Sequence, residues 1–368
     1  MRVRAQRSSG KRSSRTRRGA AIISALLVVA LSAILVSGML WRQQVQLRRI
    51  ENQRLLAQAQ WIARASLDWT RLVLRSEADT AAGITYLGGA WGVPLAKTRL
   101  SDFLGQIGEV RAEEGADTWL SGSIEDAQAR FNLRDLVATS APGALQLNLT
   151  EIEAFARLLQ ILGIDQQLAK NTAVYLRSGL AYSATRFQTQ TTTTSSSTQQ
   201  LAGGGSTGGG NFTNNPGLAD ADNNSAVAPL MMTSVDALLD VPGFTPEAVA
   251  RLRPFVTVLP TVTPVNMNTA SAEVIASVVT GMSLSSAQAL VAHRQNVFFR
   301  NVGDVQLALE AVGVKQVSID TTQLDVNTSY FLVHGRVQHE RAEVDRTTLV
   351  WRDPLTHTTR IVRVRDEP

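Results

Sequence analysis

The chain holds few residues in patterns that carry catalytic chemistry. None of its four histidines has metal-ligand spacing beside an acid or adjoins a serine motif: His293, His334, His339 and His357. No G-x-S-x-G, P-loop or G-x-G-x-x-G sequence opens a helix, and the glycine-rich AGGGSTGGGNF lacks the lysine of a phosphate loop. The lack of cysteine excludes disulfides, thiolate metal sites and cysteine nucleophiles. We therefore expect a protein that is not an enzyme.

A second group of residues could bind a cation. Asp220, Asp222 and Asn224 have the spacing of the first half of an EF-hand loop and offer the oxygen ligands that calcium prefers. The second half does not follow, because Ser225 stands where glycine belongs and Met231 where glutamate belongs. A site would need acids from elsewhere in the chain, and two candidates follow: Asp236 and Asp240. Solvated loop acids without a metal are the alternative interpretation.

Residues 265–309 raise the question of nucleic-acid binding. VNMNTASAEVIASVVTGMSLSSAQALVAHRQNVFFRNVGDVQLAL resembles the helix-hairpin-helix modules of DNA receptors, whose G-x-G turns bring backbone amides to phosphate. The turns here, at Gly243 and Gly281, lack the second glycine, and the charges within 265–309 balance. The hairpins are therefore predicted to pack helices together. A membrane-anchored protein for DNA binding or uptake remains the alternative function.

The elements that would position these residues begin with a basic leader and an apolar run. Residues 1–18 hold eight cations and no acid, so the rest of the chain is slightly acidic and its charge does not favour nucleic-acid binding. Residues 20–40 are uncharged; as a helix they extend about 31 Å, enough to cross the hydrocarbon core of a bilayer. The leader predicts a cytoplasmic N-terminus and an exported body. A signal peptide cleaved near Ser37-Gly38 is the alternative.

The helix that begins in this run is predicted to continue far beyond the membrane. No proline precedes Pro94, no glycine lies between Gly38 and Gly83, and the segment is rich in glutamine, arginine, leucine and alanine. One helix from about Ala20 to Ser76 is expected. Its second half should lay an apolar stripe on a sheet, and the predicted stripe consists of Trp41, Val45, Ile50, Leu55, Ala59, Ile62 and Trp69.

A basic leader that ends in glycine, followed at once by such a helix, resembles the N-terminus of type IV pilins and pseudopilins. The resemblance implies cleavage between Gly19 and Ala20 by prepilin peptidase, on the cytoplasmic side, and methylation of the new N-terminus. The fifth mature residue of that class is usually glutamate, which is thought to pair with the terminal amine of the adjacent subunit; this chain has Ser24. An acid in a bilayer is costly unless it is paired. A subunit that lacks the acid cannot form this pair, so it is predicted to lie at the end of a stack, where one side needs no neighbour. The alternative is that serine is tolerated within the stack.

Further segments resemble one family, the minor pseudopilin K subunits of type II secretion systems, which characteristically lack this glutamate. Four segments occur in the family's order: YLGGAWGVPLA (86–96), GSIEDAQARFNLRDL (122–136), LLDVPGFTPEAVARLRPFVTVLP and TPVNMNTASAEVIASVV. The resemblance implies a calcium-binding α-domain, and the candidate ligands are Asp220, Asp222, Asn224 and Asp236. The family's acidic W-[IL]-D-x-D motif is degraded here, since VYLRSGLAYS holds no acid.

The fold that the resemblance implies is α+β. A pilin-like long N-terminal helix lies on an antiparallel sheet, and a large all-α domain of the helix-hairpin-helix or SAM-like kind is inserted into it. Residues 118–133 are predicted to be a strand pair, or a strand with a turn at 121–123, and residues 329–367 hold three β-rich stretches. The last strands must return to pair with the early one, and residues 149–179 are predicted to form two helices.

The predicted parts of the chain follow from these elements. They are a leader at 1–19, a transmembrane and pilin-type helix at 20–78, a first part of the pilin-like domain at 79–137, an inserted α-domain at 138–325 and C-terminal strands at 326–368. Within the α-domain, residues 186–226 are rich in Thr, Ser, Gln, Gly and Asn, a composition that predicts a mobile low-complexity loop.

The function implied by the resemblance is structural. The chain is expected to be a minor pseudopilin at the tip of the type II secretion pseudopilus, acting in pseudopilus assembly and protein export across the outer membrane. Implied partners are two other minor pseudopilins in a heterotrimeric tip, prepilin peptidase and inner-membrane lipid, with the secretin or exported cargo as further candidates and no nucleic acid. The expected location is the inner membrane, crossed once, with the bulk of the chain in the periplasm.

Overall fold

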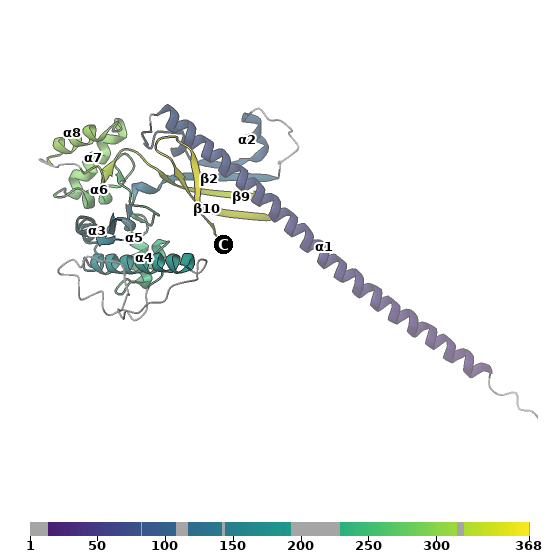
Figure 1. The fold of residues 1–368 in the computed structure, drawn as a ribbon. Helices are drawn as coiled ribbons and strands as arrows, with labels where there is room; N and C mark the ends of the chain where they lie inside the picture. Colours follow the sequence, from purple (N-terminus) through teal and green to yellow (C-terminus); the bar gives the residue numbers. More distant parts are fainter. Residues whose placement is uncertain are drawn as a thin grey trace, which may run out of the picture.

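The fold is organised around one long helix. The computed structural model describes residues 14–81, 83–107, 117–141, 144–192, 229–314 and 320–367. Helix α1 (Ser14–Thr80) is continuous, as predicted, but its 67 residues extend beyond both ends of the predicted span from about Ala20 to Ser76. Its N-terminal half extends away from all other elements (Figure 1). Every side chain from Ile23 to Arg54 is exposed. Among the described residues, the globular part first contacts α1 at Glu51, which pairs with Arg341, and the first buried side chain of the helix is Leu55.

A five-stranded antiparallel sheet packs against the second half of α1. Its order is β1-β2-β9-β10-β11, with β1 at Leu95–Arg99, β2 at Thr118–Asp126, β9 at Tyr330–His339, β10 at Ala342–Arg352 and β11 at Thr359–Glu367. The pairing of β2 with β9 confirms that the C-terminal strands return to the early strand. The short elements η1 (Ala90–Gly92) and α2 (Leu100–Ile107) flank β1. The first and last parts of the globular chain therefore form one sheet.

Strand β2 runs unbroken through residues 121–123, so the predicted turn there is wrong. Gly122 pairs with Gly335 of β9 in the middle of the ladder. A Cβ atom at Gly122 would lie 2.5 Å from the carbonyl oxygen of His334. Glycine at this position therefore permits close approach of two strands, which a sequence pattern alone does not distinguish from a turn.

The surface of α1 that lies on the sheet is made of small and aliphatic side chains. The buried residues are Leu55, Ala59, Ala63, Leu67, Leu74 and Ala78. The middle four pack on strand side chains, which are Leu120, Phe331, Val333, Val337, Val344 and Val350. The predicted stripe is right at Leu55, Ala59 and Ile62. It is wrong at Trp41, Val45, Ile50 and Trp69, which are 70%, 38%, 61% and 41% exposed. Alanine and leucine let the helix approach the strands more closely than tryptophan would.

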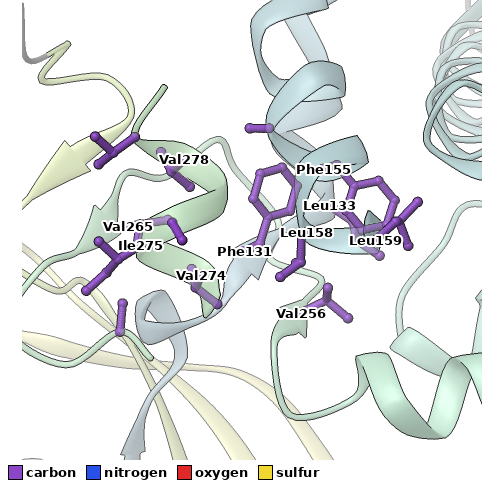
Figure 2. Close-up of a cluster of buried hydrophobic side chains, with 14 of the residues drawn as sticks. Phe131, Leu133, Phe155, Leu158, Leu159, Val256, Val265, Val274, Ile275 and Val278 are labelled. Carbon is purple, nitrogen blue, oxygen red and sulfur yellow. The ribbon is translucent and has the colours of Figure 1, made fainter. Parts of the chain in front are cut away.

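The helices that follow β2 gather round a second core, to one side of the sheet (Figure 1). Phe131 and Phe155 stack with their ring centroids 5.5 Å apart, among buried Leu158, Val256 and Ile275 (Figure 2). The elements of this α-domain are η2 (Ala127–Ala129), β3 (Phe131–Asn132), η3 (Leu133–Leu136), β4 (Val137–Ala141), β5 (Ala144–Leu147), α3 (Leu149–Ile161), α4 (Leu168–Thr192), η5 (Val235–Asp240), α5 (Pro246–Leu252), β6 (Val256–Thr257), β7 (Val265–Asn266), α6 (Ala272–Val278), α7 (Leu284–Asn296), α8 (Val302–Ala311) and β8 (Leu324–Asp325). The α+β class, with helices inserted between strands of one sheet, agrees with the prediction.

Two parts of the α-domain bear on the sequence predictions. Helix α4 continues to Thr192, beyond residue 186, the predicted start of the low-complexity loop. Extending a helix fixes one residue for each hydrogen bond gained, so a packed helix can carry a poor sequence some way past its core contacts. The rest of that predicted loop, residues 193–226, lies outside the described residues.

The hairpin turns have the geometry of helix connections. Gly243 and Gly281 have φ values of 101° and 77°, a region that glycine enters without strain. Each precedes a capped helix: the Thr245 hydroxyl accepts from the amide of Ala248, and the Ser283 hydroxyl accepts from the amide of Ser286. One amide in the first turn of each helix is therefore already bonded by the cap side chain.

Candidate functional site

The candidate processing site lies at the start of α1. Gly19, Ala20 and Ser24 are all helical, and the Ser24 side chain is exposed. Among the described residues, one helix is long and apolar enough to cross a membrane, and its most apolar window has a mean hydropathy of 2.5 with no buried residue. A bare apolar helix of this kind fits a single-pass membrane anchor.

A second exposed apolar surface lies further along α1, beyond the part of the helix that is expected to lie in lipid. At about 100° per residue, five side chains fall within about a quarter of the helix circumference, opposite the side that packs on the sheet. We call them the outer flank: Leu47, Ile50, Trp61, Trp69 and Leu72. Their exposed fractions are 60%, 61%, 69%, 41% and 62%. These large exposed apolar side chains are a candidate interaction surface.

A hollow continues the outer flank toward the α-domain. It has a volume of about 780 Å³ and is lined by Leu72, Ile84, Tyr86 and Phe298 among others. The rings of Tyr86 and Phe298 stack with centroids 4.1 Å apart, which joins the segment after α1 to the α7–α8 connection. The apolar surface available to a partner therefore includes both α1 and the α-domain.

A buried polar junction fixes the α-domain on the sheet. The carboxylate of Asp126, at the end of β2, accepts hydrogen bonds from Asn266 Nδ2 at 2.8 Å, Thr269 Oγ1 at 2.6 Å and Thr328 Oγ1 at 2.7 Å. It also accepts from the amide of Gln128 at 2.8 Å. Burial raises the pKa of Asp126, and these four hydrogen bonds act in the opposite direction. One carboxylate thus ties together three segments that are distant in the sequence.

Arg352 extends this junction to the long helix. Its guanidinium donates to the carbonyl of Leu74 at 3.1 Å, the hydroxyl of Thr85 at 2.9 Å and the carbonyl of Thr328 at 2.9 Å. The guanidinium carbon also lies 4.7 Å from the centre of the Phe331 ring. Burial lowers the pKa of Arg352, while the charge of Asp126 raises it. Arg352 therefore links the C-terminal part of α1 to Thr328, in the segment that leads from the α-domain into β9.

A second buried polar centre lies inside the α-domain. Asn132 Nδ2 donates to Asp135 Oδ1 at 3.0 Å and to Thr263 Oγ1 at 3.0 Å, and Asn132 Oδ1 accepts from the amide of Leu259 at 3.1 Å. The amide of Thr263 also donates to Asp135 Oδ1 at 3.0 Å. Burial, and then the nearby charge of Glu151, raise the pKa of Asp135 well above its ordinary value. These residues join the early strand β3 to the segment before β7.

Sequence reasoning did not identify Asp126, Asn266 or Arg352 as important. Asp126 and Asn132 stand in the quoted segment GSIEDAQARFNLRDL, and Asn266 stands in TPVNMNTASAEVIASVV. The available signal was therefore the family resemblance of these two segments, which did not single out the buried polar residues within them. Arg352 gave no such signal, because its neighbours alternate like those of any strand.

The histidines do not come together. His293 lies on α7, where its ring stacks on Phe299, whereas His334 and His339 lie on β9. His357 precedes β11, and its Nδ1 atom lies 2.7 Å from Asp79 Oδ1. In the part of the chain that the structure describes, no group of three or more His, Asp or Glu side chains could hold a metal ion.

Of the four predicted calcium ligands, only Asp236 lies within the described residues. Asp220, Asp222 and Asn224 lie outside the described residues. Asp236 lies in η5, where its carboxylate forms ion pairs with Arg253 and, at 3.6 Å, with Arg365. Two guanidinium groups make this carboxylate a poor ligand for a cation, so Asp236 does not fit the predicted role as it stands here. Calcium binding stays a prediction.

Comparison with known proteins decides the family. A model described as "Type II secretion system (T2SS), protein K" matches residues 129–261, and a second model with the same description matches residues 265–327. Together they cover more than half of the chain. The chain belongs to the type II secretion system protein K family. The predicted family is therefore confirmed, and the matched ranges contain Asn132, Asp135 and Asn266 of the buried polar centres.

Individual proteins agree with this assignment. The chain is 27% identical to the type II secretion system protein K of Pseudomonas aeruginosa over 349 residues, which cover 91% of this chain and 89% of that protein. Among solved structures, a chain of the GspK-GspI-GspJ complex from the enterotoxigenic Escherichia coli type 2 secretion system aligns with a TM-score of 0.58. The alignment covers 87% of this chain and 99% of that chain at 14% identity. At that identity the similarity shows a shared fold, and the predicted fold class is confirmed.

Proposed function

We propose that this protein is a minor pseudopilin that takes part in assembly of the type II secretion pseudopilus and in protein export across the outer membrane. The observation that carries the proposal is the outer flank of α1, an apolar row on the side of the helix that the sheet leaves open. Burial of such a row against other long helices would stabilise a helical stack. The solved GspK-GspI-GspJ complex, named for three subunits, supports two other minor pseudopilins as the partners.

The proposal places the protein at the tip of the stack. Ser24 cannot supply the carboxylate that would pair with the N-terminal amine of an adjacent subunit. A subunit at the end of the stack needs no such neighbour on one side. The α-domain, which lies beyond the sheet at the end of α1 away from the membrane, would then face the secretin or the exported cargo (Figure 1).

The proposal also fixes how the protein enters the membrane. Prepilin peptidase would cleave between Gly19 and Ala20 on the cytoplasmic side of the inner membrane, and the new N-terminus would be methylated. Residues 20–40 would cross the membrane once, with the globular part in the periplasm. No catalytic role is assigned to any residue of this chain.

Processing gives the first test. Intact mass of the membrane-extracted protein is expected to show a start at Ala20 when prepilin peptidase is co-expressed, and a start at Met1 when it is not. Gly19→Leu is expected to abolish the mature form. Gly38→Leu, inside the apolar run of residues 20–40, is expected to leave the amount of mature form unchanged. A start at Met1 despite active peptidase, or a start after Ser37-Gly38, would contradict the assembly proposal.

The outer flank gives the second test. Leu72→Glu should reduce co-purification with the other minor pseudopilins by about tenfold or more, because it sets a charge in an interface that must be desolvated. Leu307→Glu is the matched control, since Leu307 lies on α8 and is 67% exposed, against 62% for Leu72. Equal losses in the two variants would show a general effect on stability. An undiminished yield for Leu72→Glu would remove the outer flank from the interface.

A further inference from the structure

Four arginines follow the apolar run of α1. We call Arg42, Arg48, Arg49 and Arg54 the basic collar; all four side chains are exposed. None of them forms an ion pair or hydrogen bond with another described residue. The one acid in residues 42–60 is Glu51, and it already pairs at 3.3 Å with Arg341 from the turn between β9 and β10. The charge of the collar is therefore not neutralised by the chain as described.

The collar lies close to the expected membrane surface. Residues 20–40 match the thickness of the hydrocarbon core, and Trp41 follows at the position where tryptophans favour the interface. At about 1.5 Å per residue, the four Cα atoms lie about 3 to 21 Å above the end of the apolar run. Headgroups occupy about the first 5–7 Å of that distance, and arginine side chains reach down toward them. Arg42, Arg48 and Arg49 are within reach, and Arg54 is at the margin.

The distribution of the collar around the helix bears on what it binds. At about 100° per residue, Arg48, Arg49 and Arg54 are rotated by about 240°, 340° and 120° from Arg42. The four cations thus surround the helix, whereas the outer flank occupies one side. A partner helix could contact only one side of the collar. A layer of lipid headgroups surrounds the helix on all sides.

The location of these cations runs against a known bias. Lys and Arg near a membrane span favour the cytoplasmic side. Here the cytoplasmic side holds eight cations in residues 1–18, which preserves the orientation, but four more stand on the periplasmic side. Cations at a membrane surface are attracted by anionic lipids when no acid of the protein offsets them.

We propose that the basic collar binds the phosphate groups of anionic phospholipids in the periplasmic leaflet of the inner membrane. These contacts retain the subunit in the bilayer before assembly, and extraction of the helix into a stack must break them. The inference requires the membrane span but not the tip position. Its test therefore gives the same answer whether or not the protein caps a pseudopilus.

Quenching of Trp41 by brominated lipids tests the proposal in the full-length protein. Vesicles contain equal amounts of phosphatidylglycerol and phosphatidylcholine, and the acyl chains of one or the other are brominated. Trp41 adjoins the bilayer, while the other tryptophans lie at Trp61 or beyond, about 30 Å or more higher on the helix or in the globular part. Trp41→Phe identifies the quenched signal. We expect brominated phosphatidylglycerol to quench about two- to threefold more than brominated phosphatidylcholine.

Two pairs of substitutions provide matched variants. Arg48→Gln with Arg49→Gln should lower the quenching ratio toward one, and addition of Arg42→Gln and Arg54→Gln should bring it to about one. Arg64→Gln with Arg75→Gln removes the same charge from exposed positions about 36 and 52 Å above the run and should leave the ratio unchanged. High salt should lower the wild-type ratio. A wild-type ratio of one, or an equal loss in the Arg64 and Arg75 variant, would overturn the proposal.

Discussion

Asp126→Ala is expected to lower the free energy of unfolding by about 3–5 kcal/mol, the usual cost of removing one partner from a buried charged cluster. The carboxylate accepts four hydrogen bonds and lies near the buried guanidinium of Arg352. Its loss leaves the hydroxyls of Thr269 and Thr328 without their shortest acceptor in a site closed to water. It also removes the larger of the two acidic charges that act on the buried guanidinium of Arg352, the other being that of Glu77.

Urea unfolding of the mature protein in detergent measures this effect, with tryptophan fluorescence and circular dichroism as separate probes. Because Asp126 joins the sheet to the α-domain, its removal should also separate the transitions of the two cores. Asp126→Asn should lower the free energy of unfolding less than Asp126→Ala does, because asparagine keeps one acceptor oxygen. It should still be less stable than wild type, because its amide places a donor opposite Asn266 Nδ2.

Glu125→Ala is the matched control for Asp126→Ala. The two residues are neighbours on β2, but the Glu125 side chain is 42% exposed and pairs with Arg130 at 2.5 Å. Loss of an exposed pair should cost about 0–1 kcal/mol. If both variants lost the same free energy, or if Asp126→Ala left the two transitions coincident and unshifted, the buried junction would not fix the α-domain.

The elements that the sequence predicted well are those defined by local pattern. The alternating stretches after residue 329 are strands β9, β10 and β11, and the run without proline or glycine is helix α1. Periodicity and the absence of helix breakers act over short distances, so one sequence suffices to read them. The family resemblance supplied the order of the parts, which periodicity alone could not.

The contacts that the sequence could not predict depend on distant partners. Trp69 was predicted to face the sheet, yet α1 turns Ala63 and Leu67 toward it, because the strands approach closely and Trp69 instead contacts Phe103 edge-on, with centroids 5.0 Å apart. Asp126 looked like an ordinary strand-end acid until Asn266, Thr269 and Thr328 were brought to it. The candidate processing site, by contrast, is inferred from the local sequence around Gly19 and depends on no distant partner.

The second prediction concerns pH. Asp135→Asn is expected to raise the free energy of unfolding at pH 8, because the neutral amide avoids the cost of a buried negative charge. Burial and the charge of Glu151 raise the pKa of Asp135 well above its ordinary value. Asparagine keeps an Oδ1 acceptor for Asn132 Nδ2 and the amide of Thr263, which both donate to Asp135 at 3.0 Å.

The sign follows from proton linkage. Between the ordinary aspartate pKa, about 3.9 in an unfolded chain, and the raised folded pKa, the folded protein binds more protons than the unfolded chain. Stability contributed by Asp135 is therefore complete below about pH 4 and falls as pH rises through the folded pKa. Burial raises the pKa of Asp126 and Glu151 as well, so wild-type stability should fall over this range, and the difference between wild type and Asp135→Asn isolates one carboxyl.

Urea unfolding at pH 4.5, 6 and 8 measures that difference. The advantage of Asp135→Asn should be largest at pH 8 and should shrink or reverse toward pH 4.5, because the raised pKa favours the protonated wild-type carboxyl in the fold as the pH falls. Asp165→Asn, at an exposed turn between α3 and α4, is the matched surface control and should change the free energy of unfolding by no more than about 0.5 kcal/mol. A constant loss for Asp135→Asn at every pH would mean that hydrogen-bond geometry, and not the cost of a buried charge, decides the stability of this centre. The carboxyl would then be favoured there for its contacts even when ionised.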